Sequence, residues 1–174
     1  MLFYCLWRFV LNYKQELVSA ARSRIGRGAR LHQEFAGNCF ENPSELCWSE
    51  GTGTEEYDCS GLVIDVAREV FGHDAWPDDV RHVRDIWAAA KAGNTLLVPR
   101  MEPEAGDLVV LARQYTIDGQ DRTVPGHIGF VSDIGADGLR IIHAATSFMP
   151  GGRVEENPLR HSEISLGYIA LGGS

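Results

Sequence analysis

The chain has 174 residues, of which 44% are hydrophobic and 23% charged, as is typical of one soluble globular domain that can build a core without disulfides or metal. Lys and Arg number 16 against 24 Asp and Glu, which gives a net charge of −8 with no basic stripe. Nucleic acid and anionic membranes are therefore not expected as partners, because both attract positive charge.

The first residues, MLFYCLWRFVL, are apolar, but Arg8 interrupts them and they are far shorter than the roughly 20 residues of a spanning helix. We expect no membrane span, and interpret residues 1–12 as an apolar segment packed on the domain or on a partner. A cleaved secretory signal is the alternative. Its basic start is missing, although Val18 to Ala20 resembles a cleavage site. Residues 13–174 are expected to form a single domain.

Two helices are expected early in the chain. Residues 13–25 place apolar side chains at helical spacing, and Gly26 ends that pattern. Residues 58–72 carry a second apolar face, with Asp58 as a candidate N-cap. The residues between the two helices, 26–57, show no clear periodicity and predict a long loop or insertion, which in compact domains is often functional.

A third helix is expected after the pair Asp78-Asp79, which can cap it, with Val80, Val83 and Trp87 facing inward. Gly93 would end this helix. The remaining chain predicts short strands at 107–112, 127–133, 139–145 and 166–172, separated by turn residues at 103–106, 118–121 and 134–138. Helices followed by an antiparallel sheet predict the α+β class.

Cys59 stands where the loop becomes the second helix, and it can be a packed apolar residue, half of a disulfide, a metal ligand or a nucleophile. If Asp58 is the N-cap, Cys59 lies in the first helical turn, where unpaired backbone N–H groups favour a thiolate. The same groups can receive the oxyanion of a tetrahedral intermediate. Ser60 and Gly61 are small enough for a substrate carbonyl to approach the sulfur. This position favours the nucleophile.

Two histidines fall inside predicted strands. A five-residue turn at 134–138 pairs Asp133 with Leu139, and therefore Gly129 with His143. His127 is then a diagonal neighbour of His143 on the same face, at roughly 7–8 Å between backbones. A turn one residue shorter breaks this parity unless a bulge restores it. A cysteine served by a base and by a group that orients the base is the arrangement of nucleophilic catalysis.

The other cysteines are Cys5, Cys39 and Cys47, and the chain has no CxxC pair and no HxxxH. Cys39 and Cys47 can form a disulfide or remain reduced, and the sequence leaves the redox compartment open. A zinc site of Cys39, Cys47, Cys59 and a histidine is a further alternative that the spacing supports only weakly. We expect neither a metal nor an organic cofactor.

Four motifs resemble, in order and spacing, those of the NlpC family of cysteine peptidases, papain-like enzymes of bacteria and phages that cleave peptidoglycan stem peptides. The motifs are DCSGLV at 58–63, PEAGDLVVL at 103–111, GHIGFV at 126–131 and IIHAA at 141–145. The resemblance implies a papain-like NlpC-type α+β fold, with N-terminal helices and the nucleophile helix packed on a central antiparallel sheet. It implies Cys59 as nucleophile, His127 as general base and then acid, and His143 as the residue that orients His127.

The family usually carries a Pro-Tyr-x-Trp-Gly-Gly type segment before its cysteine, and its Tyr helps to line the site. The nearest match here, LCWSEGTG at 46–53, keeps Trp48 but has no Tyr in the expected place, and Tyr57 is a candidate substitute. The expected substrate-binding set comprises Trp48, Tyr57, Asp58, Ser60 and Gly126. The extra residues before Asp58 are expected to rim the cleft and to affect the peptide preference.

The sequence thus predicts a thiol hydrolase of peptidoglycan peptides or muropeptides, and the resemblance implies the bond between γ-D-glutamate and a diamino acid. Alternatives are a papain-like amidase or acyltransferase on another substrate, and a catalytically silent module that binds through the cleft. The place of action stays open between export, delivery by a phage or secretion system, and the cytoplasm. The oligomeric state is also open.

Overall fold

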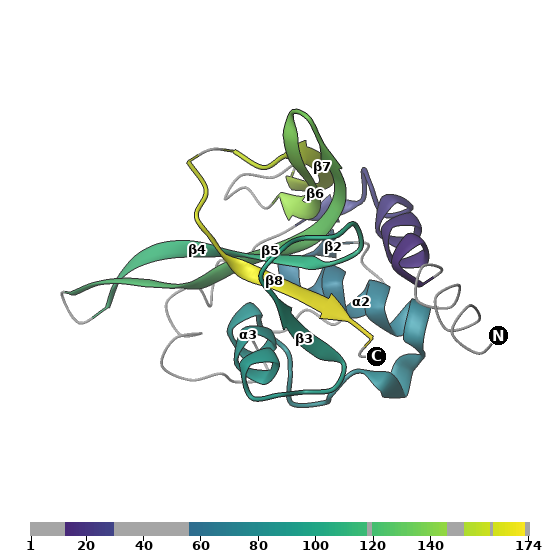
Figure 1. Cartoon of the computed structure of the whole chain (residues 1–174), viewed down its shortest axis with the longest axis horizontal. Helices are drawn as coiled ribbons and strands as arrows, with labels where there is room; N and C mark the ends of the chain where they lie inside the picture. The colour runs from purple at the N-terminus through teal and green to yellow at the C-terminus, as the bar shows by residue number, and fades with distance from the viewer. Residues whose placement is uncertain (1–12, 30–55, 118–119, 146–151, 161, 173–174) are drawn as a thin grey trace.

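The computed structural model describes residues 13–29, 56–117, 120–145, 152–160 and 162–172. The apolar segment 1–12, Trp48 and the cysteines other than Cys59 lie outside these residues, so the predictions that concern them stay predictions. Within the described residues, helices dominate the first half and strands the second (Figure 1). The predicted α+β class is confirmed.

The described strands form one sheet in the order β2-β1-β7-β6-β5-β4-β8-β3. Neighbouring strands pair antiparallel, apart from the short parallel pair of β1 and β2. The strands are β1 (Gly28–Ala29), β2 (Glu56–Tyr57), β3 (Leu97–Arg100), β4 (Leu108–Ile117), β5 (Gln120–Gly135), β6 (Gly138–Ala145), β7 (Gly152–Pro158) and β8 (Ser165–Leu171). At the left of Figure 1, β4 and β5 extend together well beyond the other strands.

The helical elements are a helix over residues 13–22, α2 (Cys59–Phe71), the 3-10 turn η4 (His73–Ala75) and α3 (Val83–Lys91). Helix α2 begins as predicted: the side chain of Asp58 accepts a hydrogen bond of 2.5 Å from the amide of Gly61. The apolar face of α2 is fully buried at Leu62, Val63 and Val66. Burial of this face fixes the helix that carries Cys59 against the sheet.

Side chains from both faces of the sheet are buried. On β4, Leu108 and Val110 pack with the helices in the main core, whereas Val109 and Leu111 join a smaller cluster. This smaller cluster includes Val131 of β5 and Ile141 of β6. Since successive side chains of a strand alternate between faces, the two clusters lie on opposite sides of the sheet. Burial on both faces explains why residues 107–112, DLVVLA, contain an uninterrupted apolar run.

Several predicted boundaries were wrong. The first helix ends at residue 22 instead of 25. Helix α3 begins at Val83, because the Asp85 carboxylate accepts a hydrogen bond of 2.9 Å from the amide of His82 and so caps the helix there, leaving Asp78 and Asp79 in a turn. Strands β3 and β7 were not predicted, and β4 and β5 are longer than expected.

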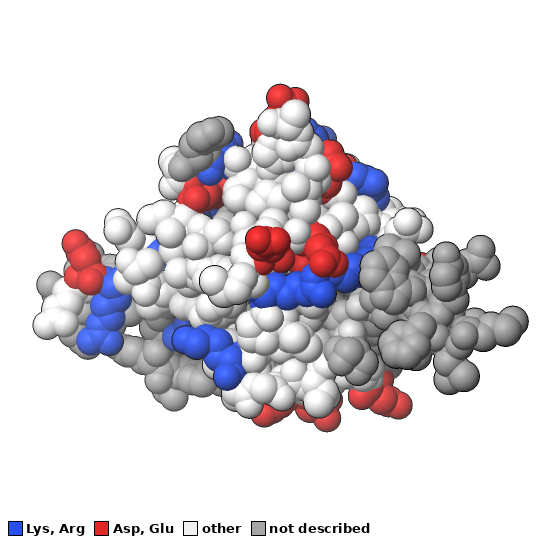
Figure 2. All heavy atoms as spheres, in the orientation of Figure 1, with Lys and Arg blue, Asp and Glu red and all other residues white. Residues whose placement is uncertain are grey.

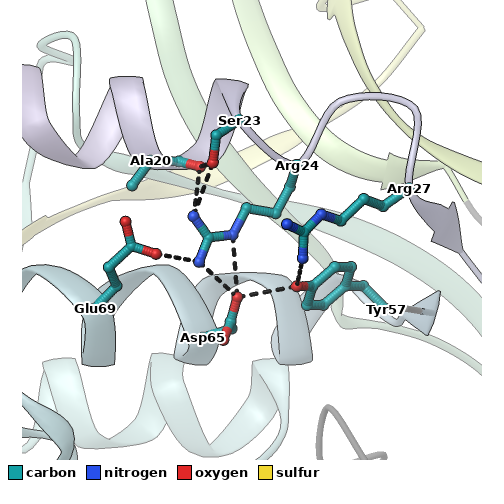
Figure 3. A network of polar contacts seen from close by, with 7 residues as sticks. All are labelled: Ala20, Ser23, Arg24, Arg27, Tyr57, Asp65 and Glu69. Atoms are coloured by element: carbon teal, nitrogen blue, oxygen red, sulfur yellow. Dashed lines mark hydrogen bonds and ion pairs between the residues drawn. The ribbon is translucent and has the colours of Figure 1, made fainter. Parts of the chain in front are cut away.

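A network of polar side chains joins the first helix to α2 (Figure 3). The guanidinium of Arg24 donates to Glu69 and, at 3.0 Å, to Asp65, both of which lie on α2. The hydroxyl of Tyr57 also donates to Asp65, at 3.0 Å, and accepts from Arg27 at 3.2 Å. Burial opposes the charge on Arg24, but Glu69 and Asp65 more than compensate and raise its pKa. The network therefore links β2, which precedes Cys59, to α2, of which Cys59 is the first residue.

Charged side chains on the surface are mixed. Figure 2 shows acidic and basic groups beside one another on one face, separated by wide uncharged areas. Among the described helices, none is long and apolar enough to cross a membrane.

Candidate active site

Cys59 is the first residue of α2, directly after its N-cap, and its side chain is half-buried. Its sulfur is surrounded by backbone N–H groups, since the amides of Ile128, Ser60 and Cys59 itself all favour the thiolate. Ile128 belongs to β5 and directly follows His127 in the chain. The N-terminus of α2 therefore brings the thiol to the strand that carries His127.

The strand register puts the two histidines on one face by a different route from the one predicted. The turn between β5 and β6 has two residues, because Gly135 pairs with Gly138, and Asp133 consequently pairs with Arg140 instead of Leu139. A bulge between Val131 and Asp133 then shifts the register by one residue, so that Val131 pairs with Ile141. The shorter turn alone would have separated the histidines, and the bulge restores the parity.

The two imidazoles are in direct contact. Nε2 of His127 lies 2.8 Å from Nδ1 of His143, and the rings meet edge to face with their centroids 5.0 Å apart. Gly129 makes this possible, because a Cβ at this position would lie 2.9 Å from the Cβ of His143. The predicted proximity of the imidazoles is thus confirmed.

The ladder between β5 and β6 ends just before the histidines. Their paired register runs from Gly135–Gly138 to Phe130–Ile142 and goes no further, while β6 remains paired with β7 as far as Ala145. The amide of Ile128, which lies beyond the last pair, is directed to the sulfur of Cys59. His127, next to Ile128 in the chain, forms the hydrogen bond with His143. The same stretch of β5 thus contributes an amide to the surroundings of the thiol and an imidazole to the histidine pair.

The expected thiolate is not the resting form. Burial raises the pKa of the Cys59 thiol to about 12, and the neighbouring charge of Asp58 adds to this rise, so the surrounding amides do not suffice to ionise it. Sequence reasoning counted the helix N-terminus but not the burial. Burial, with smaller effects from His143 and Arg113, lowers the pKa of His127 to about 3. The resting site near neutral pH therefore holds a neutral thiol and a neutral imidazole.

His143 is half-buried, and burial is also the main reason why its pKa is lowered. The carboxylates of Glu163 and Glu155 oppose this shift, whereas Arg113 adds to it. Glu155 is the register partner of His143 on β7, so its side chain starts on the same face of the sheet. Glu155, Glu163, Arg113 and Arg160 therefore all act electrostatically on His143.

The expected substrate-binding residues have structural contacts of their own. Asp58 caps α2 and accepts from the hydroxyl of Ser60, which is buried. The hydroxyl of Tyr57 is engaged by Asp65 and Arg27 instead of being free at the thiol. Gly126 lies at a register shift between β4 and β5, immediately before His127. Because the hydroxyl of Ser60 is bonded to Asp58, Ser60 would contribute to substrate binding through its backbone amide.

Sequence reasoning missed Arg113, Glu155 and Glu163. Arg113 lies on β4 two residues after Leu111, and strand alternation from the apolar Leu111 would have placed it on the histidine face. Glu155 was missed because β7 has only one buried apolar residue, Val154, and so carries no alternating pattern. No local pattern brings Glu163 to the site.

Among the described residues, no group of three His, Cys, Asp or Glu side chains is arranged to hold a metal ion. The alternative zinc site depends on Cys39 and Cys47, which lie outside those residues. It remains untested.

Comparison with known proteins finds similarity of fold alone. No protein-family model matches the chain, and no curated protein matches its sequence. Two crystal structures of an N-acetylmuramoyl-L-alanine amidase from Bacteroides uniformis are similar to the chain at 13% identity. One has a TM-score of 0.58 over 92% of this chain and 99% of the amidase, and the other 0.55 over 91% and 97%. A mutant of RipA, the resuscitation-promoting-factor-interacting protein, aligns at 18% identity over 94% of this chain and 63% of its own, with a TM-score of 0.49.

Proposed function

We propose that this protein is a cysteine hydrolase of amide bonds in peptidoglycan stem peptides, related to the NlpC peptidases. The observation that supports the proposal is that one stretch of β5 serves both groups: the amide of Ile128 favours the thiolate of Cys59, and the adjacent His127 contacts His143 at 2.8 Å. A binding module has no need of a thiol at a helix N-terminus next to paired imidazoles. Such an arrangement serves acyl transfer.

The acylation step uses His127 as the base. Its Nε2 is occupied by His143, so Nδ1 is the nitrogen that can accept the thiol proton. Because both groups are neutral at rest, the proton moves as the sulfur attacks the substrate carbonyl, and the thiolate and imidazolium stabilise each other. A carbon–sulfur bond forms, and the carbonyl oxygen becomes an oxyanion. The backbone amides of Cys59 and Ser60, which already favour negative charge on the sulfur, are suited to receive this oxyanion.

The intermediate then collapses, and the carbon–nitrogen bond breaks. The leaving amine takes the proton from His127, and a thioester remains on Cys59. Water enters, His127 removes one of its protons, and hydroxide attack releases the carboxylic acid. The proton returns to the sulfur, so the enzyme is regenerated and one water is consumed for each amide bond cleaved.

His143 determines which nitrogen of His127 is basic. Nδ1 of His127 is free of a proton when Nε2–H of His127 donates to Nδ1 of His143. If His143 were protonated, it would donate instead, and neutral His127 would carry its proton on Nδ1. The base would then be lost. The lowered pKa of His143 favours its neutral form, in which Nδ1 can accept.

The substrate class is supported by two independent likenesses. The motifs around Cys59, His127 and His143 resemble those of peptidases that cut the stem peptide after γ-D-glutamate. The fold is similar to that of an N-acetylmuramoyl-L-alanine amidase, an enzyme named for an amide bond in the same polymer. The two likenesses suggest different bonds, so the amidase bond is the second candidate. An acyltransferase would share the thioester but pass it to an amine or hydroxyl.

The test is incubation with defined muropeptides, followed by mass spectrometry of the products. We expect the native protein to cleave one amide bond, and Cys59→Ala to lower the rate by at least about 1,000-fold. Cys5→Ala is the matched control for loss of a thiol, and it should retain the native rate. Added glycinamide or hydroxylamine would appear in the products of an acyltransferase. Cleavage that survives Cys59→Ala, or no cleavage of any muropeptide by the native protein, would refute the proposal.

A further inference from the structure

Arg113 lies on the same face of the sheet as the two histidines. Leu111 is the register partner of His127 across β4 and β5, so the two side chains share a face. Arg113 follows two residues later on β4, which returns it to that face at roughly 7 Å along the strand. An arginine side chain is long enough to cover most of this distance. The side chain of Arg113 therefore projects from the same face as His127, the base of the proposed reaction, and its guanidinium can reach towards that base.

The guanidinium of Arg113 has loosely held donors. Its contacts among the described residues are a hydrogen bond of 3.4 Å to the carbonyl of the adjacent Ala112 and an ion pair of 3.7 Å with Glu163. The ion-pair distance is longer than that of a hydrogen bond. The side chain is 39% exposed. An arginine has five N–H donors, so most of them make no short hydrogen bond to the described residues.

Glu163 does not close on Arg113, because its other carboxylate oxygen accepts from the amide of Arg160 at 3.2 Å. The amide of Glu163 in turn donates to the carbonyl of Arg160 at 3.0 Å, so a tight turn holds this carboxylate. The charge of Arg113 also reaches the catalytic pair, since it helps to lower the pKa of both His127 and His143. A partly exposed cation thus lies within electrostatic range of both histidines.

We propose that Arg113 binds a carboxylate of the substrate close to the scissile amide, and so selects acidic peptides. A planar carboxylate can accept two parallel N–H bonds from a guanidinium, and such bonds are stronger and more directional than the present contact with Glu163. This inference rests on the proposed function for its substrate, but the subsite itself is defined by Arg113 and can be tested without a peptide. Arg113 would then be a specificity residue that does not take part in proton transfer.

The first test uses two thiol reagents that differ only in charge: N-bromoacetylglycine, which has a free carboxylate, and N-bromoacetylglycinamide. The rate of Cys59 alkylation is measured by peptide mapping for the native protein, Arg113→Gln and the control Arg122→Gln. Arg122 is on the same hairpin, five residues from His127 and so roughly 17 Å away along β5. We expect the native protein and the control to react about 5- to 10-fold faster with the acid than with the amide, and Arg113→Gln to lose this preference.

The second test uses the cleaved muropeptide and its analogue in which the carboxylate nearest the cleaved bond is a carboxamide. Arg113→Gln should lower kcat/KM for the acid about 10-fold, mainly through KM, and leave that for the carboxamide within about twofold. Arg113→Lys should recover part of the loss.

The outcomes separate the two proposals. Equal alkylation rates for both reagents in the native protein, or an acid preference that survives Arg113→Gln, would overturn the carboxylate subsite. An equal loss on both peptides would also overturn it, because Arg113 would then act only through the histidines. If no muropeptide is cleaved but the Arg113-dependent reagent preference is present, the hydrolase proposal fails while the subsite stands.

Discussion

The buried, neutral state of His127 makes a quantitative prediction about acid stability. Burial lowers the pKa of this residue from 6.5 to about 3. Between these values the unfolded chain binds a proton that the folded protein excludes, so the free energy of unfolding must fall as the pH falls. The contribution of neutral His127 is fully present above about pH 6.5 and is lost progressively towards pH 3.

The magnitude follows from the size of the shift. Each pH unit below 6.5 removes about 1.4 kcal/mol, so about 2 kcal/mol is lost at pH 5 from His127 alone. His143, whose pKa is also lowered, acts in the same direction. In His127→Gln this term is absent, and the free energy of unfolding should change less between pH 7 and pH 5 than in the native protein.

The assay is urea unfolding, followed by circular dichroism, at pH 7, 6 and 5. His73→Gln is the matched control, because its side chain is 78% exposed. We expect the native protein and His73→Gln to lose about 2 kcal/mol more than His127→Gln over this range. Parallel pH dependences for the three proteins would refute the reasoning, since His127 would then be accessible to protons in the folded state.

Two further substitutions test the packing around the site. In Gly129→Ala, the new Cβ would lie 2.8 Å from a backbone carbonyl oxygen of β6 and 2.9 Å from the Cβ of His143, and we expect a loss of about 1–3 kcal/mol by urea unfolding. Gly135→Ala on the same strand has no contact closer than 3.6 Å and should be nearly neutral; equal effects would contradict the close packing. Arg24→Met removes the cation of the Figure 3 network, and because the carboxylates it pairs with are partly exposed, the expected loss is about 1–3 kcal/mol. Arg22→Met, which breaks an exposed pair, should cost less than about 1 kcal/mol, and thermal unfolding that ranks the two arginines in the opposite order would count against the network.

Local sequence signals predicted the elements that hold the candidate site. Asp58 before a small and apolar run predicted the start of α2, and the alternation of β5 and β6 predicted that His127 and His143 would meet. The prediction of the turn between these strands was wrong by three residues, and the histidines meet because a bulge offsets the shorter turn. A bulge depends on packing from both sides of the strand, which the sequence of one strand does not reveal.

What the sequence could not predict depends on contacts between distant segments. The residues around Cys59 predict a thiol whose pKa is lowered by the helix N-terminus. Its pKa is instead raised, because the fold buries the thiol. Strand β3 contains Pro99, which is unusual in a strand and tolerated here because β3 lies at the edge of the sheet. The position of Glu163 beside Arg113 depends on a turn some 50 residues further along the chain.

A sulfur that keeps its proton at rest has a consequence for durability. Peroxide and other oxidants react with the thiolate form of cysteine, so a thiol with a pKa of about 12 is slow to become sulfenic acid. In the proposed mechanism, Cys59 would be open to such damage only during turnover, when a bound substrate draws the proton away. We therefore expect the proposed hydrolase to persist in oxidising surroundings without a reductant to repair it.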